Sequence, residues 1–243
     1  MKPTIVTVPC FSGAPWDARQ LAPFSDYPDR TMRLPEGLDD VEQYADFVAT
    51  QVADLDDYVL VGDSFGAVIA LTFALREPRG MRGLVLSGGF AANPLSKWKA
   101  SAAGTARHLG EGVYRQLTLR FHAYQLASEF DTTAEVPHTQ ADYRQLFLDN
   151  TPGDSYAARV TSVISFDVRD QLAHHHVPTL LITPEDDKLI GEKAARELCD
   201  GLPDAREVIL SKTGHMFRFT HPDLYGATIV DFVESLDYGS LAS

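Results

Sequence analysis

The sequence predicts an α/β fold with a mainly parallel sheet of about six strands, helices on both faces, and a helical lid insertion. Short apolar segments alternate with helical patterns along most of the chain, as in strands joined by right-handed helical crossovers. The apolar run 58–61 carries no charge, which is expected of a strand buried on both faces of a parallel sheet. At 243 residues the chain fits one large domain.

The elements follow from apolar periodicity and from glycine and proline positions. Apolar positions in 41–55 recur with helical spacing, and the helix after residue 64 should end before Pro78. Residues 92–150 contain no convincing strand. We therefore predict a core formed by 1–91 and 151–243, with 92–150 as a helical cap or lid. The predicted strands are 4–8, 30–34, 58–62, 83–89, 179–183 and 207–210.

Composition excludes several functional classes. A net charge of -13 and the lack of any Lys/Arg-rich tail make nucleic acid an unsuitable partner. No apolar stretch approaches the roughly 20 residues of a membrane span, so we expect no membrane contact and a cytoplasmic location. Cys10 and Cys199 are far apart and lack metal-ligand spacing, so free thiols are expected. The run His174–His176 suits a helix end better than a metal site, so no metal or cofactor is expected.

The segment "GDSFG" at 62–66 lies between a predicted strand and a predicted helix. Such a tight turn needs small residues at Gly62 and Gly66, and it lifts Ser64 out of the core at the carboxyl end of the sheet. Ser64 could instead serve only as a helix N-cap. The strand before it and the helix after it favour a nucleophile.

A serine nucleophile requires a base, and the base requires an orienting group. A carboxylate cluster follows the strand at 179–183, and His215 follows the last predicted strand. The carboxyl ends of parallel strands share one edge of the sheet, so these groups should meet Ser64 there. Cys10 is an alternative nucleophile, but it lacks the strand–turn–helix setting and is expected to be a packed thiol.

Several segments resemble the α/β-hydrolase superfamily in order: "WDARQLAP", "GDSFG", "FDVRDQLAHHHVPTLLITPEDD", "LPDAREVILSKTGHMFRFTHPDLY" and "ATIVDFVESL". The resemblance implies that Ser64 is the nucleophile, Asp187 the orienting acid and His215 the base. It also implies an oxyanion hole made by the backbone N–H groups of Phe11 and Phe65.

The chain departs from this family at "VPCFSGAPW", where Pro9 and Cys10 replace the usual His-Gly pair. A backbone donor needs no particular side chain, so the departure concerns the conformation of the loop. In "PEDD", Asp187 occupies the family's acid position, with Pro184 in place of a glycine. Asp186 is then expected to face solvent or to cap a helix beginning near Lys188.

The resulting functional prediction is a serine hydrolase, carboxylesterase- or thioesterase-like, that cleaves a small carboxylic ester or thioester through an acyl-enzyme and needs no cofactor. Alternatives with the same triad are a C–C bond hydrolase, a hydroxynitrile-lyase-type enzyme and a cofactor-free oxygenase; a non-enzymatic ligand-binding relative is a further alternative. Fold alone does not choose among them. Candidate pocket residues in the insertion are Trp98, Phe121, Tyr124 and Phe147.

Charge distribution suggests a partner for the insertion. Residues 93–150 contain six basic and six acidic residues, whereas the whole chain carries -13. This contrast is typical of a solvated helix surface, but it would also suit an anionic substrate or an acidic acyl carrier. The basic residues concerned are Lys97, Lys99, Arg107, Arg115 and Arg120.

Overall fold

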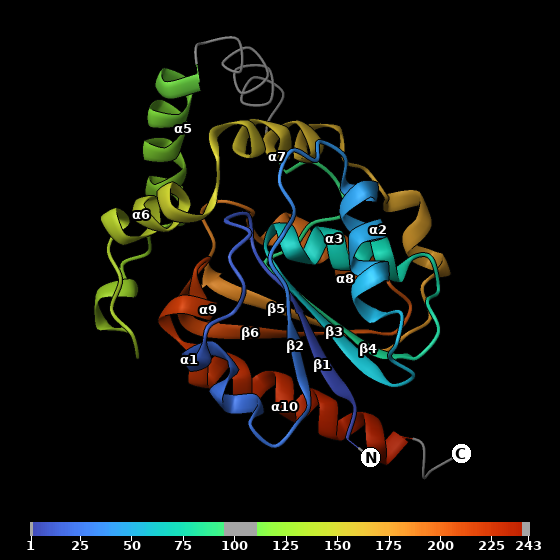
Figure 1. The fold of residues 1–243 in the computed structure, drawn as a ribbon. Helices are drawn as coiled ribbons and strands as arrows, with labels where there is room; N and C mark the ends of the chain where they lie inside the picture. The colour runs from blue at the N-terminus through green and yellow to red at the C-terminus, as the bar shows by residue number, and fades with distance from the viewer. Residues whose placement is uncertain (1, 95–110, 240–243) are drawn as a thin grey trace.

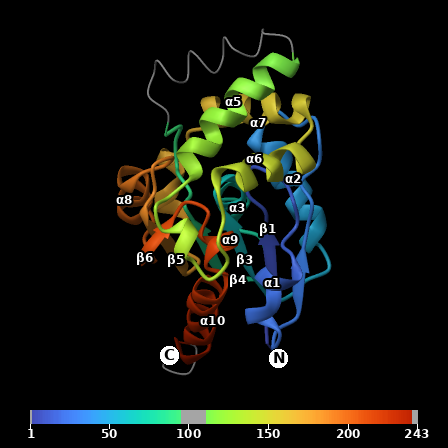
Figure 2. The ribbon, with the colours of Figure 1, turned by 90° about the vertical axis from the view of Figure 1, so that its left-hand side faces the viewer.

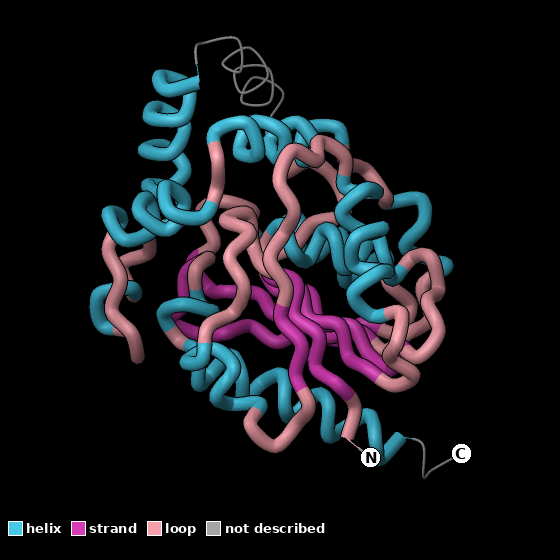
Figure 3. The backbone as a smooth tube through the Cα atoms, in the orientation of Figure 1, coloured by secondary structure: helices cyan, strands magenta, loops and turns pink. Residues whose placement is uncertain are grey.

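The computed structural model describes residues 2–94 and 111–239. Six strands form one sheet in the order β2-β1-β3-β4-β5-β6, and every neighbouring pair is parallel (Figures 1 and 3). The prediction of a mainly parallel sheet of about six strands is confirmed. The strands are β1 (Thr4–Val8), β2 (Asp29–Thr31), β3 (Tyr58–Asp63), β4 (Met81–Ser87), β5 (Thr179–Asp186) and β6 (Ala205–Gly214).

Helices cover both faces of the sheet. Figure 1 shows α1 and α10 on one face and α2, α3 and α8 on the other. The bounds are α1 (Ala18–Leu21), α2 (Val41–Val52), α3 (Phe65–Ala74), α5 (Glu111–Leu126), α6 (Gln140–Asn150), α7 (Gly153–Ser165), α8 (Glu192–Gly201), α9 (Phe217–Thr220) and α10 (Pro222–Gly239). Short 3₁₀ helices lie at Ala22–Phe24, Asp131–Thr133 and Arg169–His174.

Two hydrophobic cores form because side chains alternate along each strand. Val59 and Val61 pack with Phe232 of α10, whereas Leu60 between them packs with Tyr44 of α2 on the opposite face. All of these side chains are buried. Each such apolar side chain contributes roughly 1.5–3 kcal/mol on burial, which makes the sheet a rigid support for the strand ends.

Helices α5, α6 and α7 form a separate group above the sheet (Figures 1 and 2). Helix α5 contacts both α6 and α7. The segment before α5, residues 95–110, lies outside the described residues. Helix α7 follows residue 150 and yet joins the same group, so the division of the chain into core and lid stays a prediction.

Within residues 2–94 and 111–239, no helix has both the length and the apolarity needed to span a bilayer.

Candidate active site

Ser64 sits in a strained turn between β3 and α3. Its backbone has φ 54° and ψ -118°, a region that costs a non-glycine residue of order 1–3 kcal/mol. A Cβ atom on Gly62 would lie 2.3 Å from the carbonyl oxygen of Gly66, and one on Gly66 would lie 2.2 Å from that of Val8. The Ser64 N–H donates to the Ser87 carbonyl at 2.7 Å, which ties the turn to the end of β4. Both glycines are therefore required by steric contact.

A hydrogen-bonded chain connects three side chains that are distant in sequence. The Nε2 atom of His215 lies 2.9 Å from the Oγ atom of Ser64, and its Nδ1 atom lies 2.8 Å from Oδ2 of Asp187. Ser64 follows β3, Asp187 follows β5, and His215 follows β6. The structure thus brings together the serine, carboxylate and imidazole that the sequence suggested, at the carboxyl end of the sheet.

The second oxygen of Asp187 holds its own loop. Oδ1 accepts hydrogen bonds from the backbone N–H groups of Leu189 and Ile190 at 3.0 and 2.9 Å. The expectation that Asp186 caps a helix near Lys188 is wrong: its side chain is 25% exposed, and its Oδ2 accepts from the Ser128 hydroxyl at 2.8 Å and lies 3.1 Å from Nζ of Lys188. The next helix, α8, begins only at Glu192, so Asp187 organises the turn instead.

Burial and charge shift the pKa values of the acid and the base in opposite senses. Burial by itself would lower the pKa of His215, but the Asp187 carboxylate, the hydrogen bond to it and the charge of Asp63 outweigh burial and raise this pKa. Burial by itself would raise the pKa of Asp187, yet attraction and hydrogen bonding to His215, with the two loop N–H groups, lower it. The imidazolium form is therefore stabilised beside an ionised carboxylate.

The two candidate oxyanion donors, the N–H groups of Phe65 and Phe11, lie at a helix start and in a tight turn. Phe65 is the first residue of α3, where backbone N–H groups have no intrahelical acceptor. Phe11 lies in a tight turn closed by a hydrogen bond from the Gly13 N–H to the Cys10 carbonyl at 2.8 Å. In the described part of the chain, neither the Phe11 nor the Phe65 N–H has a hydrogen-bond acceptor.

Aromatic rings surround Phe11 and form what we call the Phe11 cluster. The Phe11 ring makes edge contacts with four rings at centroid distances of 5.1–6.2 Å. His122 also stacks on Phe147 at 4.8 Å, and its Nδ1 atom lies 3.0 Å from the Tyr156 hydroxyl. The cluster consists of Phe11, Phe65, His122, Phe147 and Tyr156. It joins α5, α6 and α7 to the nucleophile turn.

The candidate pocket residues divide into three groups. Phe147 is buried in the Phe11 cluster. Phe121 and Tyr124 are 53% and 65% exposed, which corrects the expectation that they line a pocket. The physical reason is helix register, because the buried face of α5 carries Leu119, Ala123 and Leu126 instead. Trp98 lies outside the described residues.

A buried ion pair lies beneath the nucleophile turn. Nε of Arg218 is 3.1 Å from Oδ2 of Asp63, and the guanidinium lies over the Trp16 ring. Nη2 of Arg218 donates to the sulfur of Cys10 at 3.4 Å. Burial raises the pKa of the Cys10 thiol, and the thiolate is the nucleophilic form of cysteine. Cys10 is therefore a packed, protonated thiol rather than a rival to Ser64.

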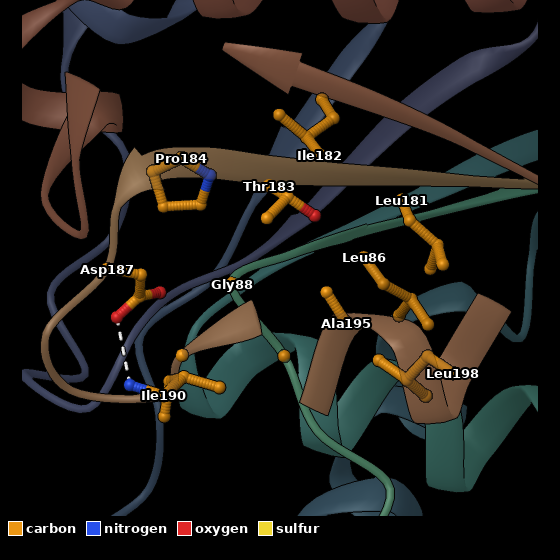
Figure 4. Close-up of a pocket in the computed structure, with 12 residues that line it drawn as sticks. Leu86, Gly88, Leu181, Ile182, Thr183, Pro184, Asp187, Ile190, Ala195 and Leu198 are labelled. Carbon is orange, nitrogen blue, oxygen red and sulfur yellow. Dashed lines mark hydrogen bonds between the residues drawn. The ribbon is translucent and has the colours of Figure 1, made fainter. Parts of the chain in front are cut away.

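A small apolar pocket lies behind Asp187, between β4, β5 and α8 (Figure 4). Leu86, Leu181 and Leu198 line it, and Figure 4 shows the hydrogen bond from the Ile190 N–H to Asp187 at its edge. Neither Ser64 nor His215 lines this pocket. Its lining includes Asp187 and Ile190 of the loop that follows β5.

Other predicted groups are placed as follows. Among the residues that the structure describes, no group of three or more His, Cys, Asp or Glu side chains could hold a metal ion. His175 is buried and its Nε2 atom lies 3.2 Å from the Thr179 hydroxyl. Lys97, Lys99, Arg107 and the side chain of Arg115 lie outside the described residues, and Arg120 is exposed.

Sequence reasoning missed three residues near the site: His122, Tyr156 and Arg159. The buried face of α7 carries Ser155, Tyr156, Arg159 and Ser162. Those positions recur with helical spacing, so a charged residue on an otherwise inward-facing stripe was the available signal. His122 lay one residue from Phe121, and choosing the correct face of α5 would have identified it.

Comparison with known proteins gives relatives that are hydrolases. The chain is 29% identical over 183 residues to a protein named carbamate hydrolase RutD from Pseudomonas savastanoi pv. phaseolicola, covering 72% of this chain and 67% of the relative. It is 25% identical over 183 residues to 2-hydroxy-6-oxononadienedioate/2-hydroxy-6-oxononatrienedioate hydrolase 1 from Dechloromonas aromatica, covering 74% and 63%. The chain thus matches about two thirds of the length of each relative.

Solved structures share the fold. A thermophilic esterase from Thermogutta terrifontis superposes with a TM-score of 0.82 at 19% identity, covering 96% of this chain and 90% of that one. The enol-lactonase from Burkholderia xenovorans LB400 gives 0.78 at 22% identity, covering 96% and 92%. Residues 31–218 match the family described as serine aminopeptidase, S33. With this match over most of its length and these structural neighbours, the chain belongs to the serine aminopeptidase family of hydrolases within the α/β-hydrolase superfamily.

Proposed function

We propose that the protein is a serine hydrolase that cleaves a small carboxylic ester or thioester through an acyl-enzyme, without a cofactor. The observation that carries this proposal is the hydrogen-bonded chain from Ser64 through His215 to Asp187, at 2.9 and 2.8 Å. A pure ligand-binding protein needs no base placed on a strained serine and no carboxylate behind that base.

The proposed reaction has two halves. Nε2 of His215 takes the Ser64 proton while Oγ attacks the substrate carbonyl carbon, and the imidazolium then donates that proton to the departing alcohol or thiol. Water, deprotonated by His215, next attacks the acyl-enzyme and releases the acid and free Ser64. Asp187 remains ionised throughout and stabilises the imidazolium.

Two backbone donors are proposed to stabilise the negative charge on the carbonyl oxygen. Phe65 N–H lies at the N-terminus of α3, whose dipole favours negative charge. Phe11 N–H is the second donor, and both N–H groups lack an acceptor within the described residues. Removing one such donor typically costs about 10²–10³-fold in kcat.

Helices α5 to α7 are proposed to act as a lid that limits substrate size. The Phe11 cluster fills the space between these helices and the nucleophile turn, and Phe147 is 1% exposed. A bulky acyl chain would have to displace these rings. We therefore expect substrates with small acyl groups to be cleaved faster than substrates with long acyl chains.

An acidic acyl carrier is a proposed partner for the basic residues in 93–150. Of these, Arg120 is exposed in the structure. Electrostatic docking of this kind is weakened by salt. Turnover of a carrier-linked thioester that falls with ionic strength, against constant turnover of a neutral ester, would support it.

A C–C bond hydrolase is the second candidate, and the names of relatives favour it. Several relatives are named 2-hydroxy-6-oxononadienedioate/2-hydroxy-6-oxononatrienedioate hydrolases. A carbamate hydrolase, as other relatives are named, would instead attack an ester-like carbonyl and fits the first candidate.

A substrate panel tests the proposal. Purified wild type and Ser64→Ala are assayed with short-chain p-nitrophenyl esters, an acyl thioester, a carbamate and a vinylogous 1,5-diketone, and both are treated with a fluorophosphonate. We expect ester or thioester turnover and labelling at Ser64 in wild type, and neither in Ser64→Ala. Cleavage of the diketone alone would select the second candidate. No turnover and no adduct would contradict both.

A further inference from the structure

We infer that Arg159 is a positioning residue that locks the turn carrying the Phe11 oxyanion donor and places a positive charge behind it. This inference rests on the proposed function, because the turn has a catalytic role only in an acyl transfer at Ser64. Arg159 acts through the Phe11 peptide and has no contact with Ser64 or His215 in the described structure.

The direction of the Phe11 N–H is set by the closing bond of the turn. Gly13 N–H donates to the Cys10 carbonyl at 2.8 Å. The Cys10–Phe11 peptide is planar and trans, so its carbonyl and its N–H point in opposite directions. The carbonyl faces Gly13, and the Phe11 N–H therefore faces away from it.

The central peptide of the same turn is held by Arg159. Types I and II of a β-turn differ by a rotation of that central peptide, which here joins Phe11 to Ser12. Nη1 of Arg159 donates to the Phe11 carbonyl at 2.7 Å and fixes one of the two orientations. The next carbonyl of the turn, that of Ser12, accepts a hydrogen bond from the Thr151 hydroxyl at 2.9 Å. In this chain Pro9 and Cys10 replace the His-Gly pair, and Arg159 of α7 holds the turn that follows them.

The charge of Arg159 is buried among neutral hydrogen-bond acceptors. The side chain is 1% exposed, and its other acceptors are the Tyr44 hydroxyl at 3.2 Å and the Pro35 carbonyl at 3.3 Å. No carboxylate lies within 4.0 Å of it in residues 2–94 and 111–239. A guanidinium stays charged in any protein, and burying an ion costs several kcal/mol.

The cost of burying this charge indicates that Arg159 has an electrostatic role. A neutral side chain would fill the same space without the loss of hydration, whereas a fixed positive charge in a low-dielectric site stabilises the negative charge that develops on a transition-state oxyanion. Gly13 makes room for the guanidinium, since a Cβ atom there would lie 2.8 Å from both Nη atoms of Arg159. Nη1 of Arg159 lies 2.7 Å from the carbonyl oxygen of Phe11, the residue whose N–H is the proposed donor.

The test compares Arg159→Met, Arg159→Lys and the matched control Tyr44→Phe with wild type. Tyr44→Phe removes one acceptor of Arg159 and keeps the bond to Phe11. We expect Arg159→Met to lose about 10- to 100-fold in kcat, somewhat less than removal of an oxyanion donor. KM should change less than twofold. The kcat of Arg159→Lys should lie between those of wild type and Arg159→Met, because lysine keeps the positive charge but lacks the forked guanidinium.

Two further readouts distinguish positioning from a general structural effect. An arylboronic acid, which forms a tetrahedral adduct with a catalytic serine, should bind Arg159→Met more weakly by the same factor as the kcat loss. The acid limb of the pH profile should not move, because the partners of His215 are untouched. Melting temperatures from circular dichroism show whether each variant is folded.

Each result of this test either supports or overturns the inference. A folded Arg159→Met with wild-type kcat, or a rise in KM that matches its loss of kcat/KM, would overturn the inference and leave the proposed function standing. If Arg159→Met fails to fold, Arg159→Lys decides in the same way: reduced kcat at constant KM supports the inference and wild-type kcat overturns it. A wild type that neither turns over nor labels would overturn the proposed function, and this inference with it.

Discussion

Asp187 binds His215 through one carboxylate oxygen and its own loop through the other. The loop therefore fixes the orientation of the carboxylate that in turn orients His215. Rotation of its carboxylate would break bonds to Leu189 and Ile190 as well as the bond to His215. This arrangement distinguishes it from its neighbour Asp186, which bonds to Ser128 and Lys188.

The first prediction compares amide substitutions at these two acids. Asp187→Asn should lower kcat by about 10⁴-fold, the loss seen in the chymotrypsin template when the acid becomes an amide. Asp186→Asn should keep kcat within a few-fold, because its partners are a serine hydroxyl and a half-exposed lysine. Steady-state kinetics on the best substrate measures both. The opposite ranking would show that Asp186 is the working acid.

The second prediction concerns pH. His215 must be neutral to accept the Ser64 proton, and its pKa is raised above its ordinary value of about 6.5. Activity should therefore fall tenfold per pH unit below a midpoint that lies above 6.5. The sign for stability is opposite: the stabilisation from this raised pKa is complete below about pH 6.5 and is lost as pH rises through the folded-state value.

The pH profile of kcat/KM and the free energy of unfolding at several pH values check this pair of trends. The residual activity of Asp187→Asn is the control. Without the carboxylate, burial dominates and lowers the pKa of His215, so the midpoint should move to lower pH. A midpoint unchanged in Asp187→Asn would mean that the carboxylate does not set the basicity of His215.

The third prediction concerns the nucleophile turn. Gly66→Ala should destabilise the protein by roughly 3 kcal/mol or more, since a Cβ atom there would lie 2.2 Å from the Val8 carbonyl oxygen and backbone must shift. Gly191→Ala is the control, because its φ of 79° is strained but its nearest atom is 4.0 Å away. That change should cost about 1–3 kcal/mol. Denaturant unfolding measures both, and equal costs would argue against steric contact at Gly66.

The fourth prediction separates the two histidines near the site. Burial, followed by the nearby charge of His215, lowers the pKa of His122 to about 3. Its ring should stay neutral from pH 8 to pH 5, whereas His215 should titrate above 6.5. The NMR signals of the two imidazole rings, followed as a function of pH, measure both titrations. The signal that is missing in His122→Gln is assigned to His122. A His122 titration near 6.5 would show that the ring is hydrated and is not packed in the Phe11 cluster.

The order of strands and helices and the position of Ser64 were predictable because their signals are local. Alternation of apolar segments marks a parallel sheet, and Gly62 and Gly66 on either side of Ser64 mark a tight turn by a pattern of five residues. Asp187 and His215 needed one further premise, the resemblance to a family in which strand ends meet at one edge. The match to residues 31–218 confirms the family.

Tertiary structure alone decided which side chains surround that triad. Phe121 and Tyr124 looked as suitable as His122 in the sequence, and the docking of α5 through Leu119 and Ala123 determined which face turned inward. The same holds for Arg159, which lies 148 residues from the Phe11 carbonyl that it holds. Helical periodicity shows which residues share a face, but only packing between distant segments determines what that face meets.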